Sequence, residues 1–153
     1  MPAQPTDKDE PTQKKSAALC LTLPLPPGIN EQYATVDGHR VSTLVARRFK
    51  RQVRDILHTL IKQGALHKEL HHQFRQSYLA LFLDFYFTTP LKRDLDGGLK
   101  ITLDALCEAL GLNDNRVVDI HLTKHIDPLH PHLYIELEAI SDWSFDEEYI
   151  LLT

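Results

Sequence analysis

The sequence predicts an α+β protein with two layers, in which a mixed β-sheet carries two main helices on one face. Short apolar segments bounded by turn residues read as four strands, at 17–26, 78–87, 117–126 and 132–140. Two longer segments, 46–63 and 95–110, repeat their apolar residues at helical spacing instead. One sheet with both helices on a single face is the simplest arrangement that buries these apolar surfaces.

The first half of the chain supplies a strand, a hairpin and a helix. The strand at 17–26 ends where two prolines and a glycine follow. A short hairpin is predicted over 31–44, because Asp37–Gly38 is a typical two-residue turn. The helix at 46–63 has an apolar stripe, and Gly64 is placed to end it.

The second half supplies three strands and the second helix. The strand at 78–87 is aromatic and apolar, and residues 88–93 read as a loop because they contain a proline. The helix at 95–110 follows, and Gly111 is placed to stop it. The last two strands alternate apolar and polar residues, with a turn at Asp127–Pro128 between them.

The composition fits one globular domain in a reducing compartment. The chain has 153 residues, of which 42% are hydrophobic and 25% charged, enough for a single core. Its two cysteines form no zinc-like or disulfide pattern. Its apolar runs are too short to cross a membrane, and its N-terminus lacks the apolar core of a secretory signal. We expect a cytoplasmic protein with a disordered tail at 1–16, a folded domain at 17–140 and an acidic extension at 141–153.

The charges are unevenly distributed along the chain. The net charge of −4 is that of segment 141–153, which leaves the middle of the chain neutral. Within the middle, a stretch without any acid holds six bases, Arg40, Arg47, Arg48, Lys50, Arg51 and Arg54. Such a basic face can contact phosphates even in an acidic protein, although a solvated helix face explains it equally well. We assign four of these bases to DNA binding, namely Arg47, Arg48, Lys50 and Arg51.

The stretch "KRDLDGGLK", residues 92–100, places two aspartates before the second helix. Acids at a helix N-terminus can simply cap it. Two neighbouring carboxylates repel each other unless a cation holds them, and oxygen ligands suit Mg²⁺ or Mn²⁺. Asp94 and Asp96 are therefore candidate metal ligands. Gly97 and Gly98 could let a phosphate or a second chain approach the backbone closely.

The second helix carries further polar groups on one strip. Asp96, Lys100 and Asp104 follow each other at intervals of four residues. Lys100 could pair with the acids, or it could meet a phosphate and stabilise developing negative charge. Asp114, in the loop after the helix, is the best candidate for a third acid. A helix over 95–110 would be roughly 24 Å long, which leaves open whether Asp114 can return to the other acids.

Four motifs together resemble one known family over residues 19–140. They are "LPLPPGINEQY", "GHRVS", "RDLDGGLKITLDAL" and "NDNRVVDIHLTK". Their order and spacing resemble the RusA family of Holliday junction resolvases. The resemblance implies a RusA-like fold and a Mg²⁺-dependent endodeoxyribonuclease, with Mn²⁺ as a substitute. Such an enzyme acts as a homodimer on branched DNA and makes paired symmetric nicks in four-way junctions during recombination and repair.

The resemblance also assigns roles to individual residues. It implies catalytic, metal-binding acids at Asp94, Asp96 and Asp114, an essential lysine at Lys100 and a supporting acid at Asp104. Asparagine usually follows the second aspartate and an acid usually begins the acidic pair, whereas this chain has glycine and asparagine there. These departures remove one side chain able to bind phosphate and one negative charge.

The last expectations concern the basic residues beside this motif and two alternative functions. Lys92 and Arg93 would hold backbone phosphates together with the basic cluster at 47–54. A non-catalytic module that binds DNA junctions with the same fold remains an alternative. A haloacid-dehalogenase-like phosphatase is a weaker one, because "TTPLKR" separates the aspartates from the apolar strand. His67 and His71 have the spacing of helical metal ligands, but we expect surface roles for them.

Overall fold

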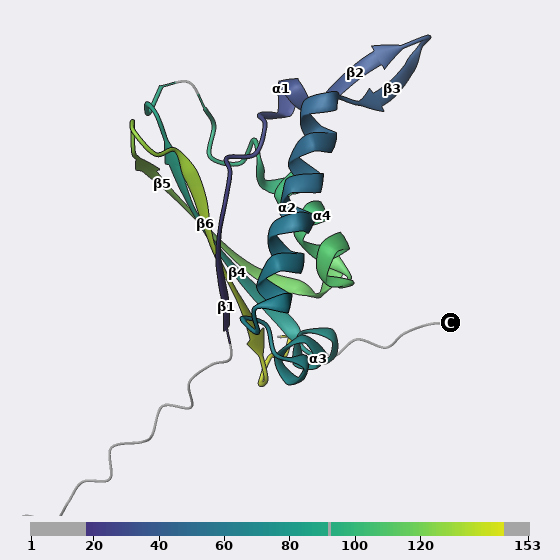
Figure 1. Cartoon of the computed structure of the whole chain (residues 1–153), viewed down its shortest axis with the longest axis vertical. Helices are drawn as coiled ribbons and strands as arrows, with labels where there is room; N and C mark the ends of the chain where they lie inside the picture. Colours follow the sequence, from purple (N-terminus) through teal and green to yellow (C-terminus); the bar gives the residue numbers. More distant parts are fainter. Residues whose placement is uncertain (1–17, 92, 146–153) are drawn as a thin grey trace, which may run out of the picture.

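A computed structural model describes residues 18–91 and 93–145, and a four-stranded sheet forms one layer of it (Figure 1). The sheet order is β1–β6–β4–β5, from the strands β1 (Ala18–Leu23), β4 (Tyr78–Phe87), β5 (Val117–Ile126) and β6 (His132–Ile140). β4 and β5 are parallel, whereas β6 runs antiparallel to both β1 and β4. The mixed sheet and all four strands are therefore confirmed.

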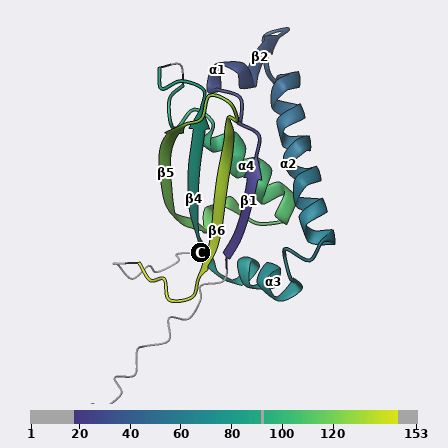
Figure 2. The same cartoon turned by 60° about the vertical axis from the view of Figure 1, so that its left-hand side comes forward.

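Helices form the second layer and cover one face of the sheet (Figure 2). α2 (Leu44–Lys62) and α4 (Leu99–Leu110) are the two main helices. Alternate residues of β4, such as Leu81, Leu83 and Phe85, are fully buried on the helix side. Because successive strand residues point to opposite faces, the alternation predicted from the sequence places the core between the two layers.

The opposite face of the sheet, which we call the open sheet face, is covered by no helix within 18–91 and 93–145 (Figure 2). Three rings stack across it, because Tyr86 lies between His125 and His132 with centroids 4.5 and 4.3 Å away. The register of the strands also places four acids on this face, namely Asp84, Asp119, Glu136 and Glu138. The open sheet face is therefore rich in carboxylates.

Two helices of the structure were not predicted from the sequence. α1 (Ile29–Gln32) is a single turn, too short to leave a periodic signal. α3 (Lys68–Gln76) buries only Phe74, so its polar sequence lacked an apolar stripe. The predicted start of the second helix at residue 95 was wrong, because 95–98 form turns that precede α4.

A hairpin projects beyond the N-terminal end of α2 (Figure 1). Its strands are β2 (Tyr33–Val36) and β3 (His39–Ser42), and all eight residues are exposed. Asp37 and Gly38 have φ values of 51° and 77°, as a two-residue turn of this type requires. The predicted hairpin and its turn are confirmed.

The ends of the chain lie largely outside the described residues. The tail at 1–16 and residues 146–153 of the acidic extension belong to these parts. The described start of the extension packs on the sheet, because Phe145 meets Tyr78 edge-on with ring centroids 5.5 Å apart. Within the described residues, every helix is too short or too polar to span a lipid bilayer.

Candidate functional site

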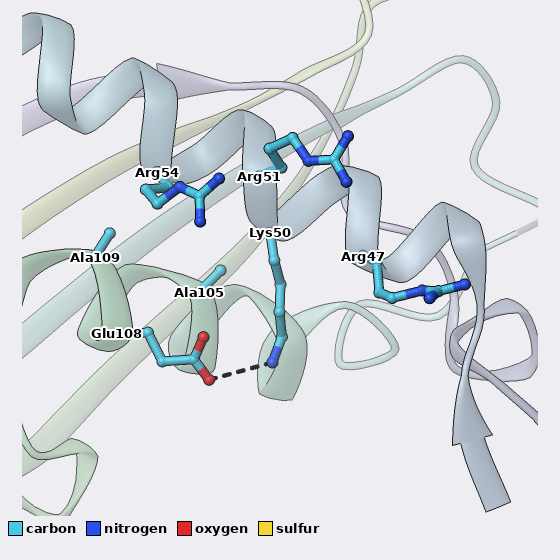
Figure 3. A pocket seen from close by; sticks show the side chains of 7 residues that line it. All are labelled: Arg47, Lys50, Arg51, Arg54, Ala105, Glu108 and Ala109. Atoms are coloured by element: carbon cyan, nitrogen blue, oxygen red, sulfur yellow. Dashed lines mark hydrogen bonds and ion pairs between the residues drawn. The ribbon is translucent and has the colours of Figure 1, made fainter.

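A groove of about 480 Å³ lies between side chains of α2 and α4 (Figure 3). It is lined by Arg47, Lys50, Arg51, Arg54, Ala105, Glu108 and Ala109. The four bases come from α2, where positions three, four and seven residues apart share one face. The two alanines come from α4 and leave room between the helices. The groove therefore has the charge and the open floor that an anion needs.

The groove brings together three of the four α2 residues that were predicted to bind DNA. Arg47, Lys50 and Arg51 line it as a group, whereas Arg48 is exposed on α2 but does not line it. Arg54, the last member of the basic cluster at 47–54, lines it as well. Sequence reasoning missed the acid Glu108, whose Oε1 lies 3.3 Å from Lys50 Nζ.

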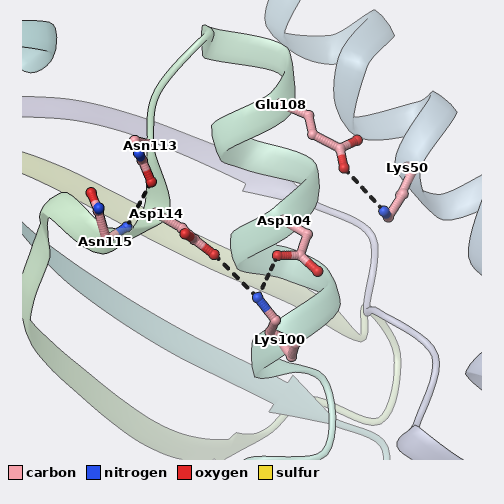
Figure 4. Close-up of polar contacts among 7 residues, drawn as sticks. All are labelled: Lys50, Lys100, Asp104, Glu108, Asn113, Asp114 and Asn115. Carbon is pink, nitrogen blue, oxygen red and sulfur yellow. Dashed lines mark hydrogen bonds and ion pairs between the residues drawn. The ribbon is translucent and has the colours of Figure 1, made fainter.

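On the neighbouring side of α4, Lys100 lies between two carboxylates (Figure 4). Its Nζ donates hydrogen bonds to Asp104 Oδ1 at 2.8 Å and to Asp114 Oδ2 at 3.1 Å. These hydrogen bonds raise the pKa of Lys100 above its usual range. The bond to Asp104 is the larger cause and the bond to Asp114 the second. Lys100 is therefore a cation at neutral pH, held by one acid from its own helix and one from the following loop.

A tight chain reversal brings Asp114 back to α4. Gly111 adopts the left-handed conformation with φ 66°, and the amide of Leu112 donates to the Cys107 carbonyl at 2.9 Å. This is a common way to end a helix with glycine. A short 3₁₀ turn, η1 (Asp114–Arg116), follows, and Asn113 Oδ1 accepts a hydrogen bond from its second residue, Asn115. Asp114 therefore meets Lys100, which helix length alone left open.

A second cavity of about 460 Å³ lies beside this cluster, and Glu108 lines it as well as the groove. Asp104 and Asp114 also line it. Burial, followed by the charges of these two acids, raises the pKa of Cys107 in its wall to about 11. Cys107 is therefore a neutral thiol at pH 7, which argues against a nucleophilic role.

The two aspartates before α4 are exposed in a fixed turn. The carbonyls of Asp94 and Asp96 accept hydrogen bonds from Gly97 N and Leu99 N. Gln32, only 3% exposed, ties this turn to α1, because its Nε2 donates to the carbonyls of Gly97 and Pro27, each at 2.9 Å. The backbone that carries both acids is therefore held in place while their carboxylates face solvent.

The two glycines of the motif have different surroundings. A Cβ at Gly98 would lie 2.4 Å from Pro26 Cγ, closer than atoms can pack. The nearest atom to a Cβ at Gly97, the carbonyl oxygen of Asp94, would be 3.6 Å away, an ordinary contact. Packing of the chain against itself therefore explains Gly98. Close approach of a ligand remains a prediction for Gly97 alone.

The three predicted metal ligands have suitable chemistry but are not gathered in this conformation. All three are carboxylates, the oxygen ligands that Mg²⁺ prefers, and Asp94 and Asp96 are exposed whereas Asp114 is half-buried. Within 18–91 and 93–145, no three acidic, histidine or cysteine side chains lie together as a metal site requires. Lys100 engages Asp114, whereas Asp94 lines a separate cavity of about 160 Å³ that also contains Glu31, a residue missed in the sequence.

The remaining candidates take part in the fold. Arg93 Nη2 donates to the Pro26 carbonyl at 2.6 Å, and Lys124 Nζ donates to the carbonyl of Arg93 at 2.8 Å. Lys92, the other predicted base, lies outside the described residues. The α3 residue His71 contacts the carbonyl of Leu110 through Nε2 at 2.6 Å, so it fixes the end of α4.

Comparisons with known proteins leave the chain without an assigned family. No protein-family model matches it, and no curated protein matches it. The resemblance to the RusA family consequently depends on the motifs of the sequence.

Proposed function

We propose that this protein is a Mg²⁺-dependent endodeoxyribonuclease that resolves four-way DNA junctions by paired nicks in recombination and repair. The observation that carries the proposal is the arrangement around α4. Lys100 and the acids Asp104 and Asp114 lie along one side of this helix, and a groove with four basic side chains lies along the neighbouring side. A backbone-binding surface therefore adjoins a cluster with the groups that phosphodiester hydrolysis needs.

The proposal gives each group of residues a role. Asp94, Asp96 and Asp114 would hold Mg²⁺, which when bound supplies a water molecule of lowered pKa and charge stabilisation. Lys100 would place a positive charge beside the scissile phosphate and stabilise its developing negative charge. Because Lys100 engages Asp114 here, the acid must leave the lysine in order to join the other two. The Lys100 side chain is 67% exposed and exposed side chains change rotamer readily, so the lysine can release Asp114.

The groove between α2 and α4 would hold the backbone of the substrate. Contacts between basic side chains and DNA phosphates fix the orientation of the DNA without reading its sequence. Recognition of a junction would therefore depend on its shape. A homodimer would place two such surfaces around one twofold axis, which suits two symmetric nicks. We expect the partners of this chain to be branched DNA and a second copy.

A module that binds junctions without cleaving them is the second candidate. Within 18–91 and 93–145, Asp94, Asp96 and Asp114 do not form one group, which favours this candidate because the groove can bind DNA without a metal site. The two candidates differ in their need for metal, since hydrolysis requires it and binding does not.

Cleavage of a labelled four-way junction tests the proposal. The wild-type protein with Mg²⁺ should nick the junction symmetrically and leave a linear duplex of the same sequence intact. Asp96→Asn and Asp114→Asn should each abolish nicking while junction binding remains. Asp37→Asn is the matched control, because asparagine tolerates the left-handed backbone of this turn. Tight junction binding without nicks in Mg²⁺ or Mn²⁺ would exclude the enzyme and leave the binding module.

A further inference from the structure

Glu108 stands out among the groups that line the groove, because among the described residues it is the one acid beside four basic side chains. Its carboxylate lies 3.3 Å from Lys50 Nζ and points into the space between the helices (Figure 3). A carboxylate carries the same charge and the same kind of acceptor oxygen as a phosphodiester. Glu108 therefore makes with Lys50 the kind of contact that a phosphate could make.

The Glu108–Lys50 contact is poorly suited to a purely structural role. The side chain of Glu108 is 65% exposed and that of Lys50 is 35% exposed. Ion pairs this open to water contribute little to stability. The contact can therefore exchange for another at small cost.

We infer that Glu108 is a resident anion of this groove, displaced from Lys50 when a DNA backbone phosphate enters. With Glu108 in place, the groove combines four positive charges with one negative charge. An entering phosphate must compete for Lys50 and approach a like charge. The carboxylate therefore lowers the affinity of the groove for any single phosphate. A ligand that also contacts the rest of the site overcomes this competition.

The position of Glu108 links the groove to the Lys100 cluster. Glu108 also lines the cavity that contains Asp104 and Asp114 (Figure 4). A DNA backbone that crosses α4 from the groove to the Lys100 cluster would pass over Glu108. Glu108 is thus a specificity-determining residue, which penalises simple duplex contacts more than contacts that span both sides. The inference rests on the DNA-binding part of the proposed function and is independent of cleavage.

Binding measured in EDTA tests the inference without any contribution from cleavage. Fluorescence anisotropy gives the Kd of labelled linear duplex and four-way junction over a series of KCl concentrations. Glu108→Gln should tighten duplex binding by roughly three- to tenfold and steepen the salt dependence by about 0.9, the slope of one added phosphate contact. The junction should gain less, so that the preference for it falls. In a Lys50→Gln background, the effect of Glu108→Gln should shrink.

Glu69→Gln is the matched control, because Glu69 is an exposed acid on α3 that does not line the groove. Unchanged or weaker duplex binding by Glu108→Gln, with wild-type DNA binding intact, would overturn the inference and leave the proposed function standing. Displacement of DNA by inorganic phosphate, beyond a chloride control of equal ionic strength, would also overturn it by showing a site for free phosphate. Absence of DNA binding in every variant would overturn both proposals. Tighter duplex binding by Glu108→Gln in a protein that never cleaves would support this inference alone.

Discussion

Lys100 contacts two acids at once, and one of them is a predicted metal ligand. Lys100→Gln should abolish junction cleavage yet tighten Mn²⁺ binding, because it releases Asp114 and removes a repelling charge. The melting temperature should change by less than about 3 °C, since the lysine side chain is 67% exposed and open ion pairs add little stability. Calorimetric titration with Mn²⁺ measures the affinity.

Lys62→Gln serves as the control for this substitution. It removes an exposed lysine in the last turn of α2, away from the acids. Weaker Mn²⁺ binding by Lys100→Gln than by this control would show that the lysine does not compete with the metal.

Alanine substitutions at the neighbouring glycines Gly97 and Gly98 should differ in their effect on stability. Gly98→Ala should destabilise the protein by about 1–3 kcal/mol, because its methyl group would overlap the Pro26 ring. Gly97→Ala has room and should be neutral, or stabilising by up to about 1 kcal/mol, through the unfolded chain. Urea unfolding monitored by circular dichroism compares the two. Equal losses would mean that the packing against Pro26 is not the reason for Gly98.

At the scale of single elements, the end of α4 governs the site. Gly111→Ala should cost about 1–2 kcal/mol, because its left-handed backbone disfavours a side chain. It should also reduce cleavage at temperatures where the variant is fully folded, since the reversal after Gly111 delivers Asp114 to Lys100. Chemical denaturation and junction cleavage at saturating Mg²⁺ measure the two effects separately.

Gly64, which follows α2, provides the control that distinguishes a loss of stability from a loss of activity. It has a similar φ of 77°, and no atom lies within 4 Å of an added Cβ. Gly64→Ala should therefore cause a comparable loss of stability and leave cleavage unchanged. Equal loss of activity in both variants would contradict a positioning role for the reversal after α4.

The elements show where sequence patterns are informative. The strands were predictable because residues such as Leu83 and Phe85 must alternate or cluster in order to be buried. α3 was missed because it buries one side chain, Phe74, and a single anchor produces no periodicity. The candidate acids and Lys100 were predicted one by one from the motifs, but the pairing of Lys100 with Asp114 depends on a chain reversal. Spacing measured along a straight helix does not contain that information.

At the scale of the whole molecule, the basic groove predicts a strong dependence of DNA binding on salt. Arg51→Gln and Arg54→Gln should each weaken binding to all sequences alike and reduce the salt slope by roughly 0.9. Arg48→Gln is the internal control, because Arg48 is exposed on the same helix outside the groove. Anisotropy titrations in KCl measure the slopes. A larger loss for Arg48 would move the DNA to another face of α2.

The groove and the open sheet face carry charges of opposite sign on opposite sides of the molecule. Bases gather along α2 on the helix layer, and the acids Asp84, Asp119, Glu136 and Glu138 lie on the far side of the sheet. In the field of a polyanion, such a body experiences a torque as well as a force. The torque rotates the bases toward the polyanion before contact, while approach in the reverse orientation is repelled. Encounters are thus sorted by orientation, and a net charge of −4 does not by itself keep this protein away from DNA.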